Sequence, residues 1–319
     1  MTVADAAAPG AAEVRGRKVK LAIREVSKTF RVRAAAGQKD DLLPVLRQIS
    51  FDVYDHEVVS LIGESGCGKT TLLRIIQGLV QLDTGTILVD DALVKGPGRD
   101  RGFVFQQANL LPWRTARQNI EFGLELQHLD RAARAKRARA LLDLVGLSAA
   151  GEQYPHELSG GMQQRIGLAR ALAIDPAILL MDEPFSALDA QNREILQQEL
   201  LRIHRQTGKT ILFVTHDLDE AIYLSDRIIV LAAKPGRVRR IIEVPFPRPR
   251  DELPLLRGDP RFQAMRAEMW ELIRSAAPNP LSPVADCLVR GGDGGLGIAR
   301  PPGRAALHVL SERDHPLGG

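Results

Sequence analysis

The sequence predicts an α/β fold built on a largely parallel central sheet. Short apolar runs, each about the length of one strand, alternate along the chain with longer stretches of helical periodicity. Residues 58–62 are mostly apolar and lead into a glycine, as a buried strand followed by a loop does. Of the 319 residues, 45% are apolar, which suffices for one large α/β domain or two small ones.

The remaining elements follow from the same patterns. Apolar and polar residues alternate from Val19 onward and again over residues 46–54, which predicts two strands with one covered face. A helix is expected from Thr71 to about Leu79, and the periodicity is helical throughout residues 111–174. We therefore expect a helical insertion within the α/β domain. The later strand-sized runs are residues 103–105, 178–181, 211–215 and 228–231.

Both ends of the chain have the composition of disordered segments. Residues 1–17 are rich in Ala and Gly, and the tail from about residue 276 is dense in Pro and Gly. The N-terminus lacks an apolar core of signal-peptide length, and no later run approaches the roughly 18 residues that cross a bilayer. A soluble protein is expected, and such a protein can still dock on a membrane protein.

Composition weakens a role in binding nucleic acid. Aromatic residues make up only 4%, too few for platforms on which bases stack. The net charge of +4 fits an anionic ligand or a membrane surface as readily as DNA. The basic run within residues 131–139 is either a solvated helix face or a nucleic-acid patch. Cys67 and Cys287 form no metal or disulfide spacing, so we expect a reducing cytosol.

The strongest chemical signal is the phosphate loop of residues 63–70. It fits G-x-x-x-x-G-K-[ST] and lies between a predicted buried strand and a predicted helix, as the motif requires. Small residues let backbone N–H groups point at the β- and γ-phosphates, Lys69 adds a full charge, and the Thr70 hydroxyl can ligate Mg²⁺. For Cys67 we prefer the role of a small side chain in a tight loop to that of a reactive thiol. The predicted nucleotide-binding residues here are Gly63, Glu64, Ser65, Gly66, Cys67, Gly68, Lys69, Thr70 and Thr71.

Polar residues follow three of the predicted strands. Asp182 ends an apolar run and is the candidate metal ligand, while Glu183 at the strand tip can orient or deprotonate a water. Alternatively, Glu183 is a helix-cap or loop acid. His216 can hydrogen-bond the γ-phosphate if its strand pairs with that of Asp182, although a histidine at a strand end is commonly structural. Gln106, after the run 103–105, can contact both metal and water.

A second glycine-rich turn, LSGGMQQR, occupies residues 158–165 at the head of a predicted helix. Ser159, Gly160 and Gly161 expose unpaired backbone N–H groups to an anion there. The simpler interpretation makes Ser159 an N-cap and the glycines a tight turn. The sequence thus raises the question of why one chain carries two phosphate-binding turns.

Six motifs in this order resemble the ATPase subunits of ABC transporters, over about residues 20–250. They are the phosphate loop (Walker A), Gln106, LSGGMQQR, ILLMDEP around Asp182, SALD at residues 186–189, and His216. The resemblance implies a P-loop NTPase (RecA-like) core with an antiparallel β subdomain and a helical subdomain insertion, and ATP and Mg²⁺ as ligands. It also implies that Asp189 lies near nucleotide and that Phe30 stacks on adenine. A phenylalanine that ends an alternating strand is otherwise usually a core residue.

The resemblance also answers the question of the second turn. In this family two nucleotide-binding domains face head to tail, so that the signature of one closes over ATP held by the other. The resemblance therefore implies a second copy of the chain. Ser159, Gly160 and Gly161 of each copy would contribute to the ATP site of the other. Residues 18–250 form the implied ATPase domain, residues 251–275 a helical extension, and residues 276–319 a disordered tail.

Narrower features indicate a subgroup. Residues 95–113, with their FVFQQANLLPW, and the later VPFPRPRD are similar to subunits that energise uptake of nitrate, sulfonates, taurine and related small anions. This similarity implies that the chain is a peripheral subunit at the cytoplasmic face of the cell membrane. It also implies membrane-spanning permease subunits as partners, an extracytoplasmic substrate-binding protein, and no nucleic acid. Leu110, Pro112 and Trp113 would offer an apolar surface to a permease helix, although interdomain packing also explains Trp113.

Two other functions remain as alternatives. An ATPase of this type that acts on nucleic acid or ribosomes usually has two cassettes, a long coiled-coil insertion or zinc-binding cysteines, and none is visible. An assembly factor that binds ATP without turnover is disfavoured because Glu183 and His216 are both present.

Overall fold

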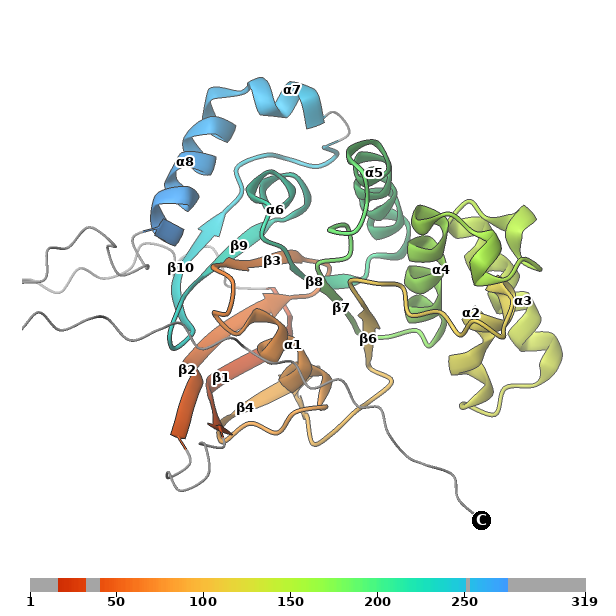
Figure 1. The fold of residues 1–319 in the computed structure, drawn as a ribbon, viewed down its shortest axis with the longest axis horizontal. Coiled ribbons are helices and arrows are strands. Elements are labelled where there is room, and N and C mark those ends of the chain that lie inside the picture. The colour runs from red at the N-terminus through yellow and green to blue at the C-terminus, as the bar shows by residue number, and fades with distance from the viewer. Residues whose placement is uncertain (1–16, 33–40, 251–252, 275–319) are drawn as a thin grey trace, which may run out of the picture. The chain divides into compact units, whose positions relative to one another are not determined.

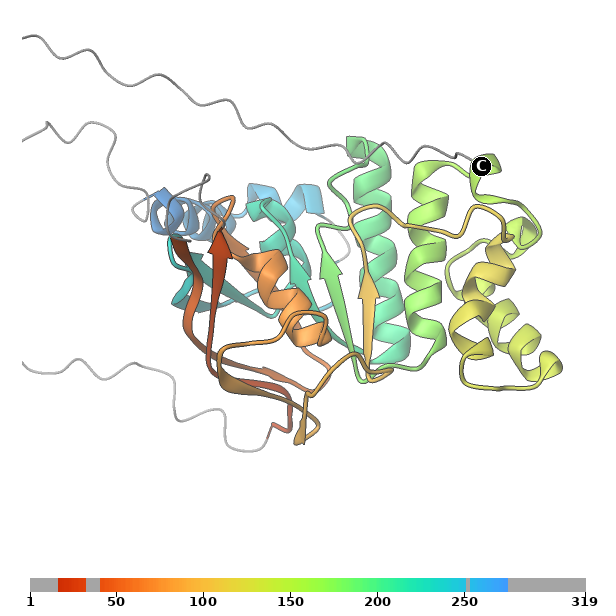
Figure 2. The ribbon, with the colours of Figure 1, turned by 60° about the horizontal axis from the view of Figure 1, so that its bottom comes forward.

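A computed structural model describes residues 17–32, 41–250 and 253–274 (Figures 1 and 2). The disorder expected for residues 1–17 and 276–319 lies outside the described residues, except that Arg17 is described. The strands are β1 (Val19–Val32), β2 (Asp41–Tyr54), β3 (Val58–Gly63), β4 (Thr84–Val89), β5 (Ala92–Leu93), β6 (Arg101–Val104), β7 (Ile178–Asp182), β8 (Thr210–Val214), β9 (Arg227–Ala232) and β10 (Arg237–Glu243). The helices are α1 (Lys69–Gln77), α2 (Ala116–Glu125), α3 (Arg131–Leu144), α4 (Gly160–Ala173), α5 (Ala190–Thr207), α6 (Leu218–Leu224), α7 (Leu253–Gly258) and α8 (Pro260–Arg274), with 3-10 turns at Ser148–Ala150 and Pro155–Glu157.

The central sheet has the strand order β10-β9-β3-β8-β7-β6. Strands β9, β3, β8, β7 and β6 run parallel, and only the edge strand β10 is antiparallel to its neighbour. This arrangement confirms the predicted α/β class with a largely parallel sheet. Because the strands are parallel, the loops that follow them all emerge at one edge of the sheet.

Both faces of the central sheet are covered, which explains why its strands are apolar throughout. On one face, Leu61, Leu180 and Leu212 pack with α1 and with the smaller sheet. On the other face, Leu179 and Phe213 join a core shared with α4 and α5. Figures 1 and 2 both show α1 and the helices α4 and α5 on opposite sides of these strands.

The smaller sheet is antiparallel, with the order β2-β1-β4-β5. Its inner face supplies Leu21, Ile23 and Ile49 to the core beside α1. Strands β4 and β10 are absent from the runs that the sequence indicated. In each strand the adjacent apolar residues are confined to a short part, residues 87–89 of β4 and residues 241–242 of β10. The rest of each strand is mostly exposed, with polar residues and a glycine in β4 and mainly charged residues in β10.

Three helices occupy the stretch of helical periodicity, and each begins at a side-chain cap. Thr115 forms a capping box with Gln118 at α2, Asp130 caps α3 and Ser159 caps α4. Ala138, Leu141 and Leu142 are the buried residues of α3 and join the core that α4 shares with the central sheet. The basic residues of α3 lie largely on its exposed side, as a solvated helix face requires.

The last two described helices pack over the far end of the central sheet. Phe262 and Met269 of α8 are fully buried in a core with Ala221 and Ile222 of α6 and with Ile228 of β9. The helices α7 and α8 therefore share packing with α6, which directly follows β8.

We predict that Gly78→Ala destabilises the fold. Gly78 ends α1 at a φ of 83°, and an added Cβ would lie 2.2 Å from the carbonyl group of Gly96. The left-handed backbone and the overlap together should lower the free energy of unfolding by about 2–4 kcal/mol, measured by urea denaturation. Gly96→Ala is the matched control, because a Cβ on Gly96 meets no atom within 4 Å. Equal losses in both variants would contradict this account of the turn.

Candidate functional site

The phosphate loop joins β3 to α1 and is shaped by glycines in the left-handed region. Gly66 has a φ of 79° and Gly68, the N-cap of α1, a φ of 94°, values that favour glycine. Lys69 is buried, and its Nζ donates to the carbonyl oxygens of Gly63 at 2.8 Å and Glu64 at 3.0 Å. The ammonium group is thereby held inside the curve of the loop, where it can face an anion.

Cys67 is a residue of this loop and is fully buried. Burial raises the pKa of the Cys67 thiol, although the nearby Lys69 charge acts in the opposite direction. A thiol with a raised pKa and no exposure is a poor nucleophile, so the structure supports its interpretation as a small side chain in a tight loop.

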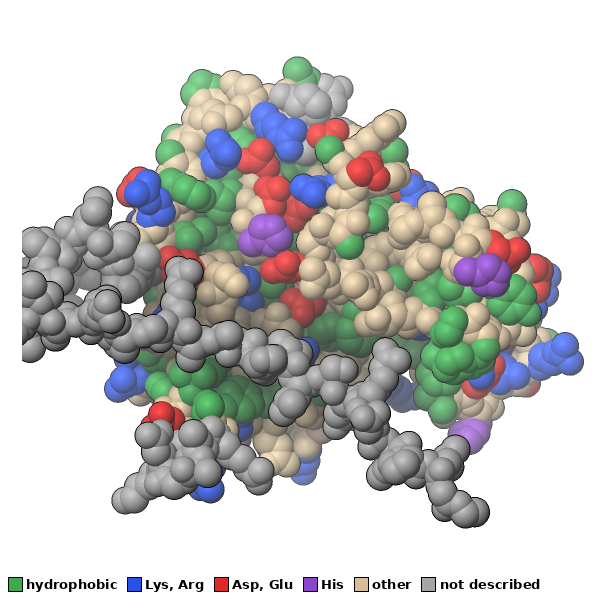
Figure 3. Space-filling view, in the orientation of Figure 1, with side chains coloured by type: hydrophobic (Ala, Val, Ile, Leu, Met, Phe, Trp, Pro, Cys, Tyr) green, Lys and Arg blue, Asp and Glu red, His purple; other side chains and the backbone are tan. Residues whose placement is uncertain are grey.

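One cavity of about 750 Å³ collects residues from five separate parts of the chain. Acidic, basic and histidine side chains gather near the middle of the face in Figure 3, over the ends of the central strands. Phe30, at the exposed end of β1, lines this cavity and is therefore not a core residue. The cavity is lined by Phe30, Val45, Ser65, Gly66, Gly68, Lys69, Thr70, Thr71, Glu183 and His216.

Asp182 and Thr70, both predicted as metal ligands, are in direct contact. Thr70 Oγ1 donates to Asp182 Oδ1 at 3.2 Å. Burial raises the pKa of the Asp182 carboxyl, and the neighbouring Glu183 charge acts in the same direction, while the hydrogen bond from Thr70 opposes both. A cation beside Asp182 would offset this cost of ionisation.

The donor set fits Mg²⁺ better than a metal enclosed by protein ligands. The described part of the chain contains no group of three or more His, Cys, Asp or Glu side chains that could hold a metal. Mg²⁺ is commonly bound by one or two protein oxygens, and phosphate oxygens and water complete its coordination. A hydroxyl and a carboxylate, as Thr70 and Asp182 supply, match that pattern.

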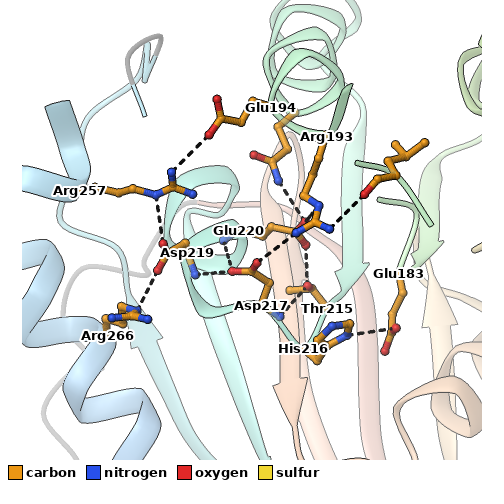
Figure 4. A network of polar contacts seen from close by, with 12 residues as sticks. Glu183, Arg193, Glu194, Thr215, His216, Asp217, Asp219, Glu220, Arg257 and Arg266 are labelled. Atoms are coloured by element: carbon orange, nitrogen blue, oxygen red, sulfur yellow. Dashed lines mark hydrogen bonds and ion pairs between the residues drawn. The ribbon is translucent and has the colours of Figure 1, made fainter. Parts of the chain in front are cut away.

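Glu183 has an unusual backbone for a non-glycine residue. Its φ is 45°, in the left-handed region, at a cost of about 1–2 kcal/mol. Its N–H donates to the carbonyl oxygen of Val214 at 3.0 Å, which ties the tip of β7 to β8. The carboxylate Oε2 lies 3.1 Å from Nδ1 of His216 (Figure 4). Because the His216 side chain is 64% exposed, it has no packing role in the core.

The turn that carries His216 is fixed by its neighbours, which the sequence reasoning did not identify. Thr215 Oγ1 accepts from the N–H of Asp217 at 3.0 Å and donates to Glu220 Oε2 at 2.6 Å. The Asp217 carboxylate caps α6 by accepting from the N–H groups of Asp219 and Glu220. Burial raises the pKa of Glu220, and the hydrogen bond from Thr215 partly opposes that rise. The acidic run that follows His216 was the available sequence signal.

Arg193 of α5 is a second residue that the sequence reasoning missed. Its Nη2 donates to the carbonyl oxygen of Leu188 at 3.1 Å, and its Nη1 lies 3.8 Å from Asp217 Oδ2. Arg193 thereby connects the SALD segment to the turn beyond His216 (Figure 4). Asp189, in that segment, is the N-cap of α5, and hydrogen bonding to the Asn192 backbone and side chain lowers the pKa of its carboxyl.

The second glycine-rich turn does not line the phosphate-loop cavity. Ser159 caps α4 by accepting from the N–H of Met162 at 3.3 Å, as the simpler interpretation expected. Gly160 instead lines a separate cavity of about 340 Å³, together with Gln106 and Leu188. Gln106 follows β6, the neighbour of β7, and so lies at the same edge of the sheet without reaching the first cavity.

None of the described helices is long and apolar enough to cross a membrane.

Comparison with known proteins places this arrangement in a family. Residues 46–186 match the family model described as ABC transporter. An uncharacterised ABC transporter ATP-binding protein of Methanocaldococcus jannaschii is 50% identical over 234 residues, which are 73% of this chain and 85% of that protein. The taurine import ATP-binding protein of Yersinia pestis is 43% identical over 71% of this chain and 90% of its own length. The nitrate import ATP-binding protein of a Synechocystis strain is 42% identical over 76% of this chain and 92% of its own length.

A solved structure is similar as well. The dimeric ATP-binding cassette in a post-hydrolysis state, bound to ADP and Pi, is 33% identical with a TM-score of 0.61, covering 71% of this chain and 99% of that chain. The phosphate loop, the acidic end of β7 and His216 converge at the carboxyl edge of a parallel sheet, and relatives match this chain over most of their length. The chain therefore belongs to the ATP-binding proteins of ABC transporters and is an ABC-type ATPase.

Proposed function

We propose that two copies of this chain close around two ATP molecules and hydrolyse them to drive import of a small anion through a partner permease. Each copy would hold ATP in the cavity of its own phosphate loop, with Phe30 against the adenine. Residues 18–250 form the ATPase domain in this proposal, and residues 251–275 form a C-terminal extension.

The roles of the site residues follow from their positions. Lys69 and the loop N–H groups bind the β- and γ-phosphates, and Thr70 and Asp182 hold Mg²⁺ with help from Gln106. When bound, the metal neutralises phosphate charge. Glu183 accepts a proton from the attacking water, whose oxygen bonds to the γ-phosphorus as the bond to the ADP oxygen breaks. His216, 3.1 Å from Glu183, donates a hydrogen bond to the γ-phosphate.

The observation that carries the dimer is the spare room around Gly160 and Gly161. A Cβ on Gly160 would meet its nearest atom at 3.9 Å, and one on Gly161 at 3.7 Å, both ordinary contacts. Neither residue has a positive φ. Alanine would fit both positions and is the better helix former, so neither space nor backbone conformation within one copy requires the two glycines at the start of α4. Close approach of a second copy's nucleotide to the exposed N–H groups supplies a reason for them.

We predict that Glu183→Gln binds ATP but does not turn it over. Glutamine keeps the size of the side chain and cannot accept the proton, so phosphate release should fall at least about 100-fold. Light scattering should then detect an ATP-dependent dimer, because the bound nucleotide persists. Hydrolysis at the parental rate would remove Glu183 from the role of base. A variant that stays monomeric with bound Mg-ATP, even beside its membrane partners, would contradict the composite site.

Gly160→Ala and Gly161→Ala should separate stability from activity. Alanine fits both positions and favours the helix, so the denaturation midpoint should stay equal or rise. ATP hydrolysis and ATP-dependent dimerisation should fall by about tenfold or more, since the methyl group would occupy space reserved for the partner's nucleotide. Gly167→Ala is the control on the same helix. Its Cβ would make an ordinary contact of 3.5 Å with Ala108 of the same chain, so we expect parental ATP hydrolysis and dimerisation. Parental ATPase activity in both Gly160→Ala and Gly161→Ala would contradict the proposal that these glycines leave room for the partner's nucleotide.

Import of a small anion is supported by the relatives and by the surface around Trp113. The taurine and nitrate import proteins match this chain over nearly their whole length. Trp113 is 70% exposed, yet the loop that carries it is held by the fully buried Asn119. The Asn119 side chain accepts from the N–H of Leu111 and donates to the carbonyl oxygens of Leu111, Arg114 and Thr115. An exposed tryptophan on a fixed loop is suited to anchor a partner.

The proposed partners are two membrane-spanning permease subunits, fed by an extracytoplasmic substrate-binding protein. The ATPase would sit as a peripheral subunit on the cytoplasmic face of the cell membrane. The transported anion is nitrate, a sulfonate or taurine in this proposal. Nitrate and taurine rest on the activities named for the relatives, and other sulfonates rest on the sequence resemblance alone.

Trp113→Ser should uncouple this subunit from its permease. We expect the variant to hydrolyse ATP within about twofold of the parental rate but to lose copurification with the permease and uptake of labelled nitrate or taurine. Trp270→Ser is the matched control, because Trp270 of α8 is also exposed and lies on another element. Unchanged uptake would count against docking at Trp113. Recovery of ribosomes or DNA with the full chain, in place of a permease, would overturn the transport function.

A further inference from the structure

We propose that Arg257 and Arg266, on the C-terminal helices α7 and α8, are positioning residues for His216. They act through Asp219 on α6, so that the C-terminal extension contributes to ATP hydrolysis without reaching the nucleotide. This inference rests on the role proposed above for His216.

The position of His216 depends on the first turn of α6. His216 lies between Thr215, which donates to Glu220, and Asp217, which caps the helix. Both neighbours are therefore tied to residues of α6, and the imidazole has no packing of its own because it is exposed. A shift of α6 would consequently move His216 relative to Glu183.

Two arginines from the C-terminal extension converge on one carboxylate of α6 (Figure 4). Arg257 Nε donates to Asp219 Oδ2 at 3.0 Å, and Arg266 Nε lies 3.0 Å from Asp219 Oδ1 in an ion pair. The Asp219 side chain is 22% exposed, whereas Arg257 and Arg266 are 42% and 54% exposed, so the carboxylate is partly enclosed between two cations that remain in contact with water. Each carboxylate oxygen thus has its own cation, which fixes the start of α6 from two directions.

Arg257 also reaches α5. Its Nη1 lies 3.3 Å from Glu194 Oε1, one helical position beyond Arg193. Arg193 contacts Asp217 and the carbonyl of Leu188 from the inner side of the same two helices. Figure 3 shows acidic and basic side chains intermixed over this region between α5, α6 and α7. Arg193 and Arg257 therefore each connect α5 to the start of α6. Of these two, only Arg257 belongs to the C-terminal extension.

The charge balance explains why the arginines are needed there. Asp217, Asp219 and Glu220 place three carboxylates within four residues. Like charges at such spacing repel one another. Among the described contacts, Arg193 faces the first and third, while Arg257 and Arg266 face the second. Without Arg257 and Arg266, Asp219 would turn away from its neighbours and loosen the turn.

The test is the steady-state ATPase of the full chain with Arg257→Ala and Arg266→Ala combined. We expect kcat to fall about three- to tenfold while the KM for ATP stays within about twofold, because binding groups are untouched and only a transition-state contact is displaced. Asp219→Asn should give the same loss, and adding it to the double variant should cause no further loss. Lysine at both arginine positions should restore part of kcat.

Glu268→Ala is the matched control. Glu268 of α8 pairs with Arg240 of β10 at 3.2 Å on the exposed surface, and among the described ion pairs none joins Glu268 to α6. We expect its kcat to equal that of the parent. An equal fall in kcat for Glu268→Ala, a proportional rise in KM in the arginine variant, or additive losses with Asp219→Asn would each overturn the proposal, since each indicates general damage to the extension.

His216→Ala separates the two levels of the argument. If His216→Ala hydrolyses ATP at the parental rate, the role proposed for His216 fails, and this inference fails with it. If His216→Ala is inactive but the double arginine variant has parental kcat, only the positioning role is refuted.

Discussion

Parallel pairing of β3, β8 and β7 is the constraint on which the site depends. Val59 of β3 pairs with Leu212 of β8, and Leu212 pairs with Leu180 of β7, so the three strands end together. The phosphate loop, His216 and the Asp182–Glu183 pair follow those three ends. If one of these strands shifted by one residue against its neighbour, its side chains would turn to the opposite face of the sheet. Both the packing of the core and the geometry of the site would then be lost.

A feature of the fold or of the site can be predicted from the sequence most directly when its residues lie in one stretch of the chain. The phosphate loop, its strand and its helix lie in one stretch, so their order was readable from residue types alone. The contact between Thr70 and Asp182 joins residues far apart in sequence, yet it follows once the two strands are assumed to share a sheet. Residues that four motifs predicted separately, from Phe30 to His216, line one cavity.

Other features carry no local pattern. Arg193, Arg257 and Asp219 look like ordinary charges on helix surfaces, and only their packing shows that they meet. Strands β4 and β10 have only short apolar stretches, at residues 87–89 and 241–242, because most of each strand is exposed. Gln106 shares the sheet edge with Asp182 but lines the neighbouring cavity with Gly160. The position of Gln106 follows from the order of the strands in the sheet and could not be predicted from the residues next to it in the sequence.

The backbone of Glu183 has a consequence for how this protein responds to selection. Its left-handed φ is unfavourable for most residues with a Cβ, whereas glycine and asparagine tolerate it best, so either of these would relax the turn and make the fold more stable. A laboratory search for heat-tolerant variants, scored only on soluble yield, should therefore accumulate substitutions at this position. Such variants would be more stable but unable to hydrolyse ATP. At this turn, stability and catalytic activity therefore favour different residues.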